Sequence, residues 1–330
     1  MRLRNLRGVA GALAVALAAL PGTPPYHAAH AADAYPNRPI TIVVPFGAGS
    51  GTDIATRIIA QPLGAALGQN IVVDDRPGAN GGIAAAYVAK AAPDGYTLLM
   101  STNSPHSSNP ALLKNLAYDP VKDFAPITRI GSFTLMCVVN PTVPATSLAE
   151  LIAYARANPG KLAYASGNTS GILAGETLKH WAGIDILHIP YKSVPPALND
   201  LIAGRVAIAF SDLTPVLPHV ASGAVRPLGI TRLRRSALLP DLPTFAESGL
   251  KDFEVESWAG LFAPAGVPAP IVARLNGETR AIVDNPEIKA QLTRVGFEAF
   301  GSTPQELDAF VKDQLVRTAR MVKEAGIEPE

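Results

Sequence analysis

One junction constrains the fold of this chain more than any other feature: an apolar run, a glycine-rich loop and a helical pattern follow one another without interruption. The residues are Thr41-Ile-Val-Val-Pro-Phe-Gly-Ala-Gly-Ser-Gly-Thr-Asp53. A helix that begins directly after such a loop points its free backbone N–H groups and the positive end of its dipole at one place. The junction therefore predicts a βα unit whose loop can bind an anion.

A second junction of the same kind lies in the other half of the chain, at Leu162-Ala-Tyr-Ala-Ser-Gly-Asn-Thr-Ser-Gly171. Glycines in both loops let a ligand approach the backbone closely. Further donors come from the side chains of Ser50, Thr52, Ser166, Asn168, Thr169 and Ser170. Each loop alone is also explained as a tight turn with a helix cap, because Ser, Thr, Asp and Asn commonly cap helices. Two such loops in opposite halves favour a ligand held between two lobes.

Short apolar runs rich in branched residues alternate with helical patterns along most of the chain. The strand-like runs are Ile40–Val44, Ile71–Val73, Tyr96–Met100, Leu162–Ala165, Ile186–Ile189, Val206–Phe210 and Leu228–Thr231. The helical stretches are Thr52–Leu67, Gly81–Ala91, Ser147–Ala157, Gly171–Ala182, Pro196–Ala203 and Pro215–Ser222, and from Pro268 onward we expect helices only. The alternation predicts an α/β fold with mostly parallel, helix-flanked sheets.

The length of the chain predicts two lobes, because about 300 residues exceed one compact core. The extended run Ile127–Val139 and the strand-like segment Glu254–Ala263 are the natural connections between them. We expect a signal peptide at residues 1–31, lobe 1 at residues 32–131 and 256–330, and lobe 2 at residues 132–255. The hinge would lie near Ile130–Ser132 and Glu254–Ser257.

The first residues have the pattern of a secretory signal. Arg2, Arg4 and Arg7 form a basic start, an apolar run extends from Gly8 to Leu20, and Ala29-His-Ala31 is a small-residue cleavage motif. The apolar run is too short to span a membrane, so an N-terminal anchor is the weaker alternative. We expect cleavage after Ala31 and export of the mature chain to the periplasm.

Charge and cysteine content exclude several classes of protein. Cleavage after Ala31 removes three of 28 basic residues and no acidic one, which leaves 25 against 27 and a net charge of −2. Such a chain has no electrostatic footprint for nucleic acid. Cys137 is the only cysteine, so no intrachain disulfide and no cysteine-based metal site is expected.

The usual catalytic and cofactor motifs are incomplete. Gly47-Ala-Gly49-Ser-Gly51 would need a glycine at Thr52 to match a dinucleotide fingerprint, and a phosphate-binding P-loop would need a lysine there. Neither loop contains the G-x-S-x-G of a nucleophile elbow. The histidines have no metal-ligand spacing. We expect no catalytic residues, no cofactor and no bound metal.

Several motifs, in order along the chain, resemble the receptors of tripartite tricarboxylate transporters, also called the Bug family. They are Tyr35-Pro-Asn-Arg-Pro-Ile40, Val44-Pro-Phe-Gly-Ala-Gly-Ser-Gly-Thr-Asp53, Asp75-Arg-Pro-Gly-Ala-Asn-Gly-Gly82, Ala92-Pro-Asp-Gly-Tyr-Thr-Leu-Leu99, Tyr118-Asp-Pro-Val-Lys-Asp-Phe124, His188-Ile-Pro-Tyr-Lys192 and Leu239-Pro-Asp-Leu-Pro-Thr244. The resemblance implies a type II periplasmic binding-protein fold. It also implies a solute receptor that captures a small organic carboxylate and delivers it to membrane transporter subunits. We expect it to be a monomer.

The resemblance also implies where the ligand lies, because in this family the carboxylate is held between the two loops by backbone donors and bridging water. It points to Phe46, Gly47, Ala48, Ser50, Gly51, Thr52 and Asp53 in the first loop, and to Ala165, Ser166, Gly167, Asn168, Thr169 and Ser170 in the second. Asp53 is expected to shape its loop, because its charge would repel a carboxylate.

Three further residues are candidates for the rest of the ligand. Lys192 could pair with a second carboxylate, and a solvated loop lysine is the alternative. Asp212 could accept from an amine or a hydroxyl, and capping the next helix is the alternative. Trp258 would line the cleft or belong to the core of a lobe.

Two other classes of function stay open from the sequence alone. A secreted α/β enzyme acting on a small carboxylated substrate is the main alternative, and it would require a nucleophile–base pair that no motif supplies. A structural or adhesive envelope protein is the third, and it predicts no binding of small ligands. The receptor is the interpretation that the two loops favour.

Overall fold

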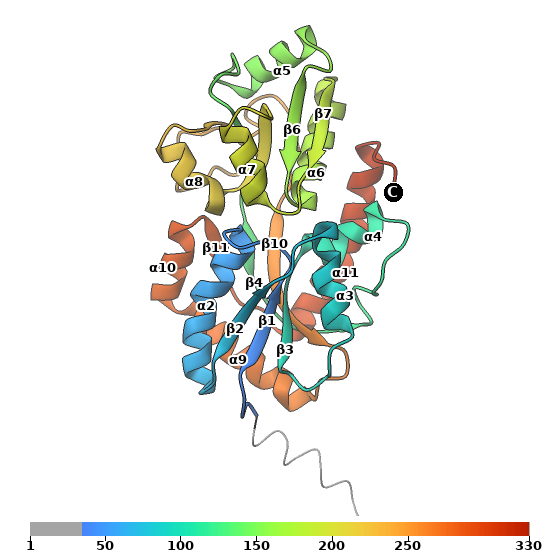
Figure 1. Cartoon of the computed structure of the whole chain (residues 1–330), viewed down its shortest axis with the longest axis vertical. Helices are drawn as coiled ribbons and strands as arrows, with labels where there is room; N and C mark the ends of the chain where they lie inside the picture. Colours follow the sequence, from blue (N-terminus) through green and yellow to red (C-terminus); the bar gives the residue numbers. More distant parts are fainter. Residues whose placement is uncertain (1–34, 330) are drawn as a thin grey trace, which may run out of the picture.

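The computed structural model describes residues 35–329, which form two lobes, each built on its own β-sheet (Figure 1). The expected signal peptide at residues 1–31 lies outside the described residues. Within residues 35–329, every helix is too short or too polar to cross a membrane. The α/β fold with two lobes, expected from the sequence, is therefore confirmed.

The lower lobe in Figure 1 contains a six-stranded sheet in the order β11-β4-β10-β3-β1-β2. β1 is parallel to β2 and β3, whereas β10 is antiparallel to β3 and β4, and β11 is antiparallel to β4. The strands are β1 (Ile40–Val44), β2 (Ile71–Asp75), β3 (Thr97–Thr102), β4 (Phe124–Phe133), β10 (Ser257–Pro264) and β11 (Phe297–Ala299). The helices are α2 (Gly51–Leu67), η1 (Ala79–Gly81), α3 (Gly82–Ala89), η2 (Ser104–Ser108), α4 (Asn109–Leu112), α9 (Ala269–Asp284), α10 (Pro286–Arg294) and α11 (Pro304–Glu324).

The upper lobe contains a five-stranded sheet in the order β7-β6-β8-β5-β9. β6 is parallel to β7 and β8, and β5 is antiparallel to β8 and β9. The strands are β5 (Leu135–Val139), β6 (Leu162–Ser166), β7 (Ile186–Pro190), β8 (Ile208–Asp212) and β9 (Arg226–Ile230), and the helices are α5 (Leu148–Ala157), α6 (Thr169–Ala182), α7 (Val194–Ile202) and α8 (Leu213–Ala221). The carboxyl ends of β1 and β6 face each other between the lobes, so the loops that follow them meet there (Figure 1).

Two details of the predicted fold are corrected by the structure. Both sheets are mixed rather than mostly parallel, since the strands that lead into and out of the second lobe pair antiparallel with their neighbours. The region after Pro268 is not only helical, because it contains β11. This strand has three residues, too few for a pattern of alternating burial to stand out in the sequence.

The chain crosses between the lobes twice, and Arg232 holds the two crossings together. Only Thr134 separates β4 from β5, and residues 231–256 return the chain from β9 to β10. Nη2 of Arg232 donates to Glu256 Oε1 (2.7 Å) and Ser132 Oγ (3.2 Å), and Nη1 donates to Glu298 Oε2 (2.8 Å) and Thr134 Oγ1 (3.2 Å). The connection between the lobes is therefore braced by one arginine.

Both faces of each sheet are covered by apolar residues, which explains why the strands appear as continuous apolar runs. In β1, Ile42 packs into one cluster and Val43 into the cluster on the opposite face, as the alternation of side chains along a strand requires. In β5, Cys137 likewise packs into one cluster and Met136 into the cluster on the opposite face. Cys137 is fully buried, and burial raises the pKa of its thiol to about 12.

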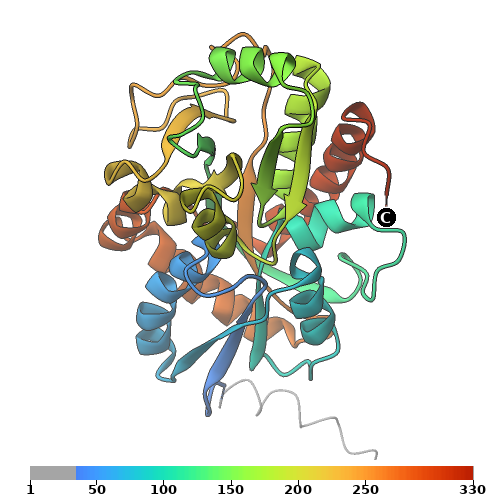
Figure 2. The same ribbon diagram turned by 45° about the horizontal axis from the view of Figure 1, so that its top comes forward.

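The lobes also touch along one flank. Leu112 of α4 and Val322 of α11 belong to the same apolar cluster as Leu173 and Leu178 of α6. Figure 2 shows the end of α11 beside α4, next to the strands of the second lobe. The C-terminal helix, which packs on the first sheet over most of its length, therefore reaches the second lobe.

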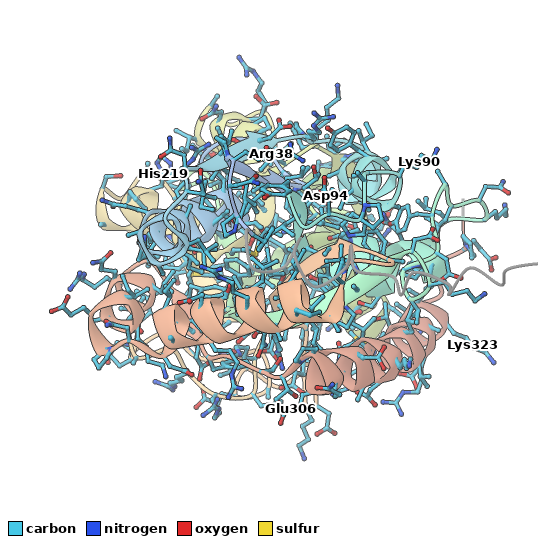
Figure 3. All side chains as sticks on the ribbon, turned by 90° about the horizontal axis from the view of Figure 1, so that it is seen from below. Arg38, Lys90, Asp94, His219, Glu306 and Lys323 are labelled. Carbon is cyan, nitrogen blue, oxygen red and sulfur yellow. The ribbon has the colours of Figure 1, made fainter. Side chains whose placement is uncertain are left out.

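The opposite end of the first lobe is held by polar contacts with the start of β1. Arg38 and Asp94 lie near each other in the view from below (Figure 3), with Arg38 Nη2 at 2.8 Å from Asp94 Oδ2. Tyr35 Oη donates to the carbonyl oxygen of Gly95 (2.7 Å). These contacts fasten the chain before β1 to the turn before β3.

Candidate ligand-binding cleft

The first glycine loop connects β1 to α2 and is shaped by Asp53. Ser50 caps α2, since its Oγ accepts from the backbone N–H of Asp53 (3.3 Å). Asp53 Oδ2 in turn accepts from the backbone N–H of Gly49 (2.8 Å), which has a φ of 79°. This left-handed conformation favours glycine. The Asp53 carboxylate is used within the loop, as a loop-shaping role requires.

An arginine supports this loop from behind. Arg57 Nε lies 2.6 Å from Asp53 Oδ1, and Arg57 Nη2 lies 3.1 Å from Asp75 Oδ2. Burial and the nearby charge of Asp53 raise the pKa of Asp75 to about 6, against the opposing effect of Arg57. Two carboxylates therefore share one cation at the start of α2.

The second loop connects β6 to α6 and presents only some of its side chains to the other lobe. Asn168 caps α6, with Oδ1 accepting from the backbone N–H of Gly171 (2.9 Å). Ser166 Oγ lies 2.6 Å from His188 Nε2, and His188 is stacked on Tyr164 with 4.8 Å between the ring centroids. The Ser166 hydroxyl is thus engaged within the second lobe, and the side chain of Ala165 is buried in its core.

Thr169 and Ser170 do reach across to the first lobe. Ser170 Oγ accepts from Asn103 Nδ2 (2.9 Å), and Thr169 Oγ1 lies 2.8 Å from Ser104 Oγ. The backbone N–H of Thr169 donates to Ser104 Oγ (3.2 Å), and Asn103 Oδ1 accepts from Ser257 Oγ (2.8 Å). All five residues are buried. The first turn of α6 is therefore in direct contact with the end of β3, and the two lobes are closed on each other.

The glycines of both loops allow this close approach. A Cβ on Gly47 would lie 3.1 Å from Ser193 Oγ, and one on Gly51 would lie 3.1 Å from the Phe133 ring. A Cβ on Gly167 would lie 2.3 Å from the carbonyl carbon of Ser193. The first loop therefore packs against the start of α7, and a side chain at Gly167 would collide with the backbone there.

Asp212 lies at the end of β8, close to the first loop, and is 4% exposed. Its Oδ2 is 3.4 Å from Asn168 Nδ2, while its Oδ1 is buried without a hydrogen-bond partner among residues 35–329. The side chain makes no capping hydrogen bond with α8, which was the alternative explanation for this residue. Burial raises the pKa of Asp212 to about 7. A carboxyl group in this position is suited to a ligand that donates a hydrogen bond.

Lys192 lies between Tyr191, whose backbone N–H donates to the carbonyl oxygen of Ser166 (2.8 Å), and Ser193, which packs against Gly47 and Gly167. It follows β7, its side chain is exposed, and it forms no hydrogen bond or ion pair with another residue in 35–329. The neighbouring side chain of Ser193 is buried against the two loops.

Sequence reasoning missed Asn103, Ser104, Ser193 and Ser257. Asn103 and Ser104 directly follow β3, which the sequence did predict, and polar residues at the carboxyl end of a parallel strand are a usual source of ligand contacts. That signal could have identified the first two. Ser193 and Ser257 have no comparable local signal, because their roles depend on which segments the two lobes bring together.

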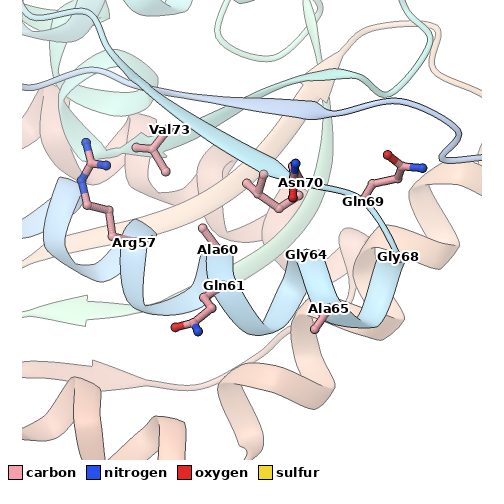
Figure 4. A pocket seen from close by; sticks show the side chains of 10 residues that line it. Arg57, Ala60, Gln61, Gly64, Ala65, Gly68, Gln69, Asn70 and Val73 are labelled. Carbon is pink, nitrogen blue, oxygen red and sulfur yellow. The ribbon is translucent and has the colours of Figure 1, made fainter.

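A hollow of about 700 Å³ lies outside the cleft, beside α2 and β2 (Figure 4). Small residues and amides form most of its wall, including Ala60, Gly64 and Asn70. Its charged group, Arg57, is already engaged by Asp53 and Asp75. The hollow therefore offers an anion no charged group that is not already engaged.

The cleft residues also show little means of holding a metal. Within residues 35–329, His, Cys, Asp and Glu form no group of three or more that could bind an ion. The polar groups between the lobes are mostly hydroxyls, amides and backbone N–H groups. Such groups suit an organic anion better than a metal ion.

Known proteins share this two-lobed architecture. The family model described as "Tripartite tricarboxylate transporter family receptor" matches residues 55–327. The structure of R. palustris Rpa4515 with adipate has a TM-score of 0.88 and 37% identity and covers 90% of this chain and 100% of its own. The periplasmic binding protein BugD has a TM-score of 0.86 and 35% identity, with 90% and 100% covered. MatC from Rhodopseudomonas palustris with bound malate has a TM-score of 0.82 and 32% identity, with 87% and 100% covered. These likenesses confirm the periplasmic binding-protein fold, and the chain belongs to the tripartite tricarboxylate transporter receptor family.

Proposed function

We propose that this protein is a periplasmic receptor that captures a small organic carboxylate between its lobes and delivers it to the membrane subunits of a tripartite tricarboxylate transporter. The observation that carries the proposal is the meeting of two helix N-termini at one interface. α2 begins at Gly51 in the first lobe, and α6 begins at Thr169 in the second. Their free backbone N–H groups and positive dipole ends favour an anion held from both sides.

Neutral donors suit a carboxylate that is bound partly through water. Neither loop contains lysine or arginine, so the anion would be held by N–H and O–H groups rather than by an ion pair. Phe46, Gly47, Ala48, Ser50, Gly51 and Thr52 would contribute from the first loop, with Asp53 supporting it, and Gly167, Asn168, Thr169 and Ser170 from the second. Ala165 and Ser166 would act through their backbone.

Asp212 favours a ligand with a hydroxyl or ammonium group near the bound carboxylate. Its Oδ1 is buried without a partner among residues 35–329 and lies in the part of the cleft that Gly51 and Asn168 also form. Malate, the ligand held by MatC, carries such a hydroxyl, whereas adipate does not. A hydroxy or amino acid is therefore the class that we favour for this chain. Lys192 is an alternative partner for a second carboxylate, and a solvated side chain is the other explanation for it.

We also propose the division of the chain that the sequence suggested: lobe 1 at residues 32–131 and 256–330, and lobe 2 at residues 132–255. The sheets use strands from these ranges, with β4 extending two residues past the first boundary. Ligand binding would stabilise the closed arrangement of the lobes, and opening would occur about Ile130–Ser132 and Glu254–Ser257, next to the contacts of Arg232.

A ligand screen on residues 32–330 tests the receptor function. Malate, adipate, succinate, glutamate and benzoate should be compared with glucose and calcium by thermal shift, followed by calorimetry. A bound carboxylate should raise stability by ~2.7 kcal/mol at a hundredfold excess over its Kd. A shift with glucose or calcium alone would contradict the carboxylate assignment. If no compound shifts the protein, the structural or adhesive alternative gains support.

The enzyme alternative is tested in the same samples. The contact of Ser166 with His188 is the closest approach to a nucleophile–base pair at the loops, although the Ser166 side chain is buried within the second lobe. Products should be followed by NMR during prolonged incubation with each acid. We expect none, and turnover that Ser166→Ala abolishes would overturn the receptor function.

The location can be tested on the full chain. Cell fractionation should place the protein in the periplasm, and sequencing its N-terminus should give Ala32 as the first residue. A protein that stays in the membrane with residues 1–31 attached would contradict the predicted cleavage.

A further inference from the structure

A cavity of about 240 Å³ lies beside the contact between the lobes, on the flank where α11 approaches α6. Both lobes form its wall. Leu173 comes from α6, whereas Ser108, Arg129 and Trp258 come from the first lobe. Asn103, which contacts Ser170 across the lobes, belongs to the same wall. The cavity is therefore completed when the lobes close.

Two buried polar groups in this wall have no hydrogen-bond partner among residues 35–329. They are the indole Nε1 of Trp258, whose side chain is 1% exposed, and the hydroxyl of Ser108, which is fully buried. An indole N–H can only donate a hydrogen bond, and a hydroxyl can also donate one. A buried donor that makes no hydrogen bond costs free energy. Two residues that line the cavity therefore carry hydrogen-bond donors without an acceptor.

The same wall contains the cationic side chain of Arg129. The guanidinium of Arg129 lies 3.9 Å from the ring centroid of Phe310 and 4.7 Å from that of Phe300. Its Nε is buried without a partner among the described residues. Burial lowers the pKa of Arg129, because its charge is separated from water. The aromatic rings stabilise the cation but do not neutralise it.

The acidic residues near the cavity do not accept hydrogen bonds from these two donors. Glu254 and Glu256 also line it, but Glu256 Oε1 pairs with Arg232 at 2.7 Å. Glu254 is exposed, as is Arg317 on the opposite side. The wall therefore presents two neutral donors without a partner and one half-buried cation, together with apolar surface from Leu173 and Phe310.

We propose that this cavity binds one carboxylate group, held by Trp258 Nε1–H, Ser108 Oγ–H and Arg129. The carboxylate has two chemical sources. It is either the far end of a dicarboxylate whose near end lies between the glycine loops, which rests on the proposed function, or a separate small monocarboxylate. In both cases Leu173 and Phe310 cover the hydrocarbon part, and occupancy stabilises the closed lobes.

The two tryptophans of the chain provide a direct readout and a matched control. Labelling tryptophan with ¹⁵N should give two indole N–H signals, and Trp181→Phe assigns them. Trp181 lies on α6, is 41% exposed and packs against Phe253 rather than lining this cavity. Trp258→Phe removes the N–H donor and keeps an aromatic ring.

The labelled protein should be titrated with malate, succinate, adipate, hexanoate and propionate, with calorimetry on the same samples. We expect a carboxylate to move the Trp258 signal downfield and to leave the Trp181 signal in place. Trp258→Phe, Ser108→Ala and Arg129→Met should each lower the affinity for that carboxylate, measured by calorimetry, at least fivefold. Trp181→Phe should leave this affinity unchanged.

The arms of the titration separate the two sources. A response to malate, succinate or adipate, with none to the monocarboxylates and loss of the response in Gly51→Ala, identifies the far end of a dicarboxylate. A response to propionate or hexanoate that Gly51→Ala leaves intact identifies a separate molecule. Heat of binding that depends on Gly51, with the Trp258 signal unmoved at saturation, overturns the cavity site and leaves the receptor function standing. A protein that gives neither heat nor a shift with any probe overturns both.

Discussion

Asn103 Nδ2 and Ser170 Oγ lie 2.9 Å apart, although one residue follows β3 of the first lobe and the other belongs to the first turn of α6 in the second. Ser257 Oγ donates to the other side of the same amide, at 2.8 Å from Asn103 Oδ1. A single side chain therefore joins the end of a strand, a crossing segment and the second glycine loop. Its removal should affect closure more than the stability of either lobe.

Replacing Asn103 by alanine should open the unliganded protein and weaken ligand binding. The loss of a buried hydrogen bond, roughly 0.5–1.5 kcal/mol, corresponds to an affinity about 2–10-fold lower. Solution scattering should show a larger radius of gyration for the variant without ligand. Asn158→Ala is the control, because Asn158 Nδ2 donates to Tyr154 O within the second lobe. Equal radii for Asn103→Ala and the wild type would show that this contact does not hold the lobes together.

Alanine at Gly167 should be far more damaging than alanine at Gly277. The new Cβ at position 167 would lie 2.3 Å from backbone atoms of Ser193 and Val194, whereas at position 277 no neighbour lies within 4 Å. Gly277 is inside α9, where alanine is favoured by roughly 0.5–1 kcal/mol. Chemical denaturation should show a loss of stability for Gly167→Ala and a gain for Gly277→Ala. A Gly167→Ala protein with native stability and affinity would mean that the second loop is not packed against α7.

Substitution of a glycine in the first loop should lower the ligand affinity more than substitution of Ser50. Gly51→Val would press on Phe133 and Asp212, whose atoms are already 3.1 and 3.5 Å from an added Cβ. Ser50→Ala removes one helix cap, worth about 1 kcal/mol. Calorimetry should therefore show a larger loss of affinity for Gly51→Val. Full affinity in that variant would mean that the loop is a tight turn with no role in ligand binding.

The pH dependence of stability should report on Asp212. Because burial raises its pKa from 3.8 to about 7, the folded state holds this proton over a pH range in which the unfolded state has lost it. Stability should therefore fall as pH rises from about 4 to 7. One pKa unit corresponds to about 1.4 kcal/mol, so even part of this shift should change Tm by roughly 2–4 °C.

Asp212→Asn should flatten this slope in thermal unfolding measured from about pH 4 to 8. Some slope should remain, because the pKa of Asp75 is raised to about 6 and acts in the same direction. An unchanged slope in Asp212→Asn would mean that Asp212 is ionised across this range.

Lys192→Met should change the affinity for both mono- and dicarboxylates less than twofold. The lysine is exposed and has no ion pair within residues 35–329, and exposed charges contribute little. Calorimetry with matched acids of equal chain length provides the comparison. A large loss confined to dicarboxylates would place the second carboxylate at Lys192 instead of at Trp258 and Arg129.

Local features of the site could be predicted from the sequence, whereas the contacts between residues of different lobes could not. The β1–α2 and β6–α6 junctions were found because strand, loop, cap and helix lie within a few residues of one another. Asn103 contacts Thr169 and Ser170, more than sixty residues away, so its role depends on the arrangement of the lobes. The engagement of Ser166 by His188 was missed for the same reason.

Errors in the predicted fold have a similar origin. A helical period and a strand period reveal type and approximate position, but not whether neighbouring strands are parallel. β5 and β10 follow chain crossings, and their direction is set by the path of the chain rather than by their own residues. The short helix η2 also escaped prediction, because its residues Ser104 to Ser108 are polar and lack an apolar stripe.

The solitary thiol of Cys137 has a practical consequence for how this protein can be made. It lies at the centre of β5 with no exposed surface, and no second cysteine exists to pair with it. Folding therefore requires no oxidation step and no disulfide isomerase. A version that starts at Ala32 should reach the same native state in the reducing cytosol of an expression host as in an oxidising compartment, and reducing agents in the buffer should leave its melting curve unchanged.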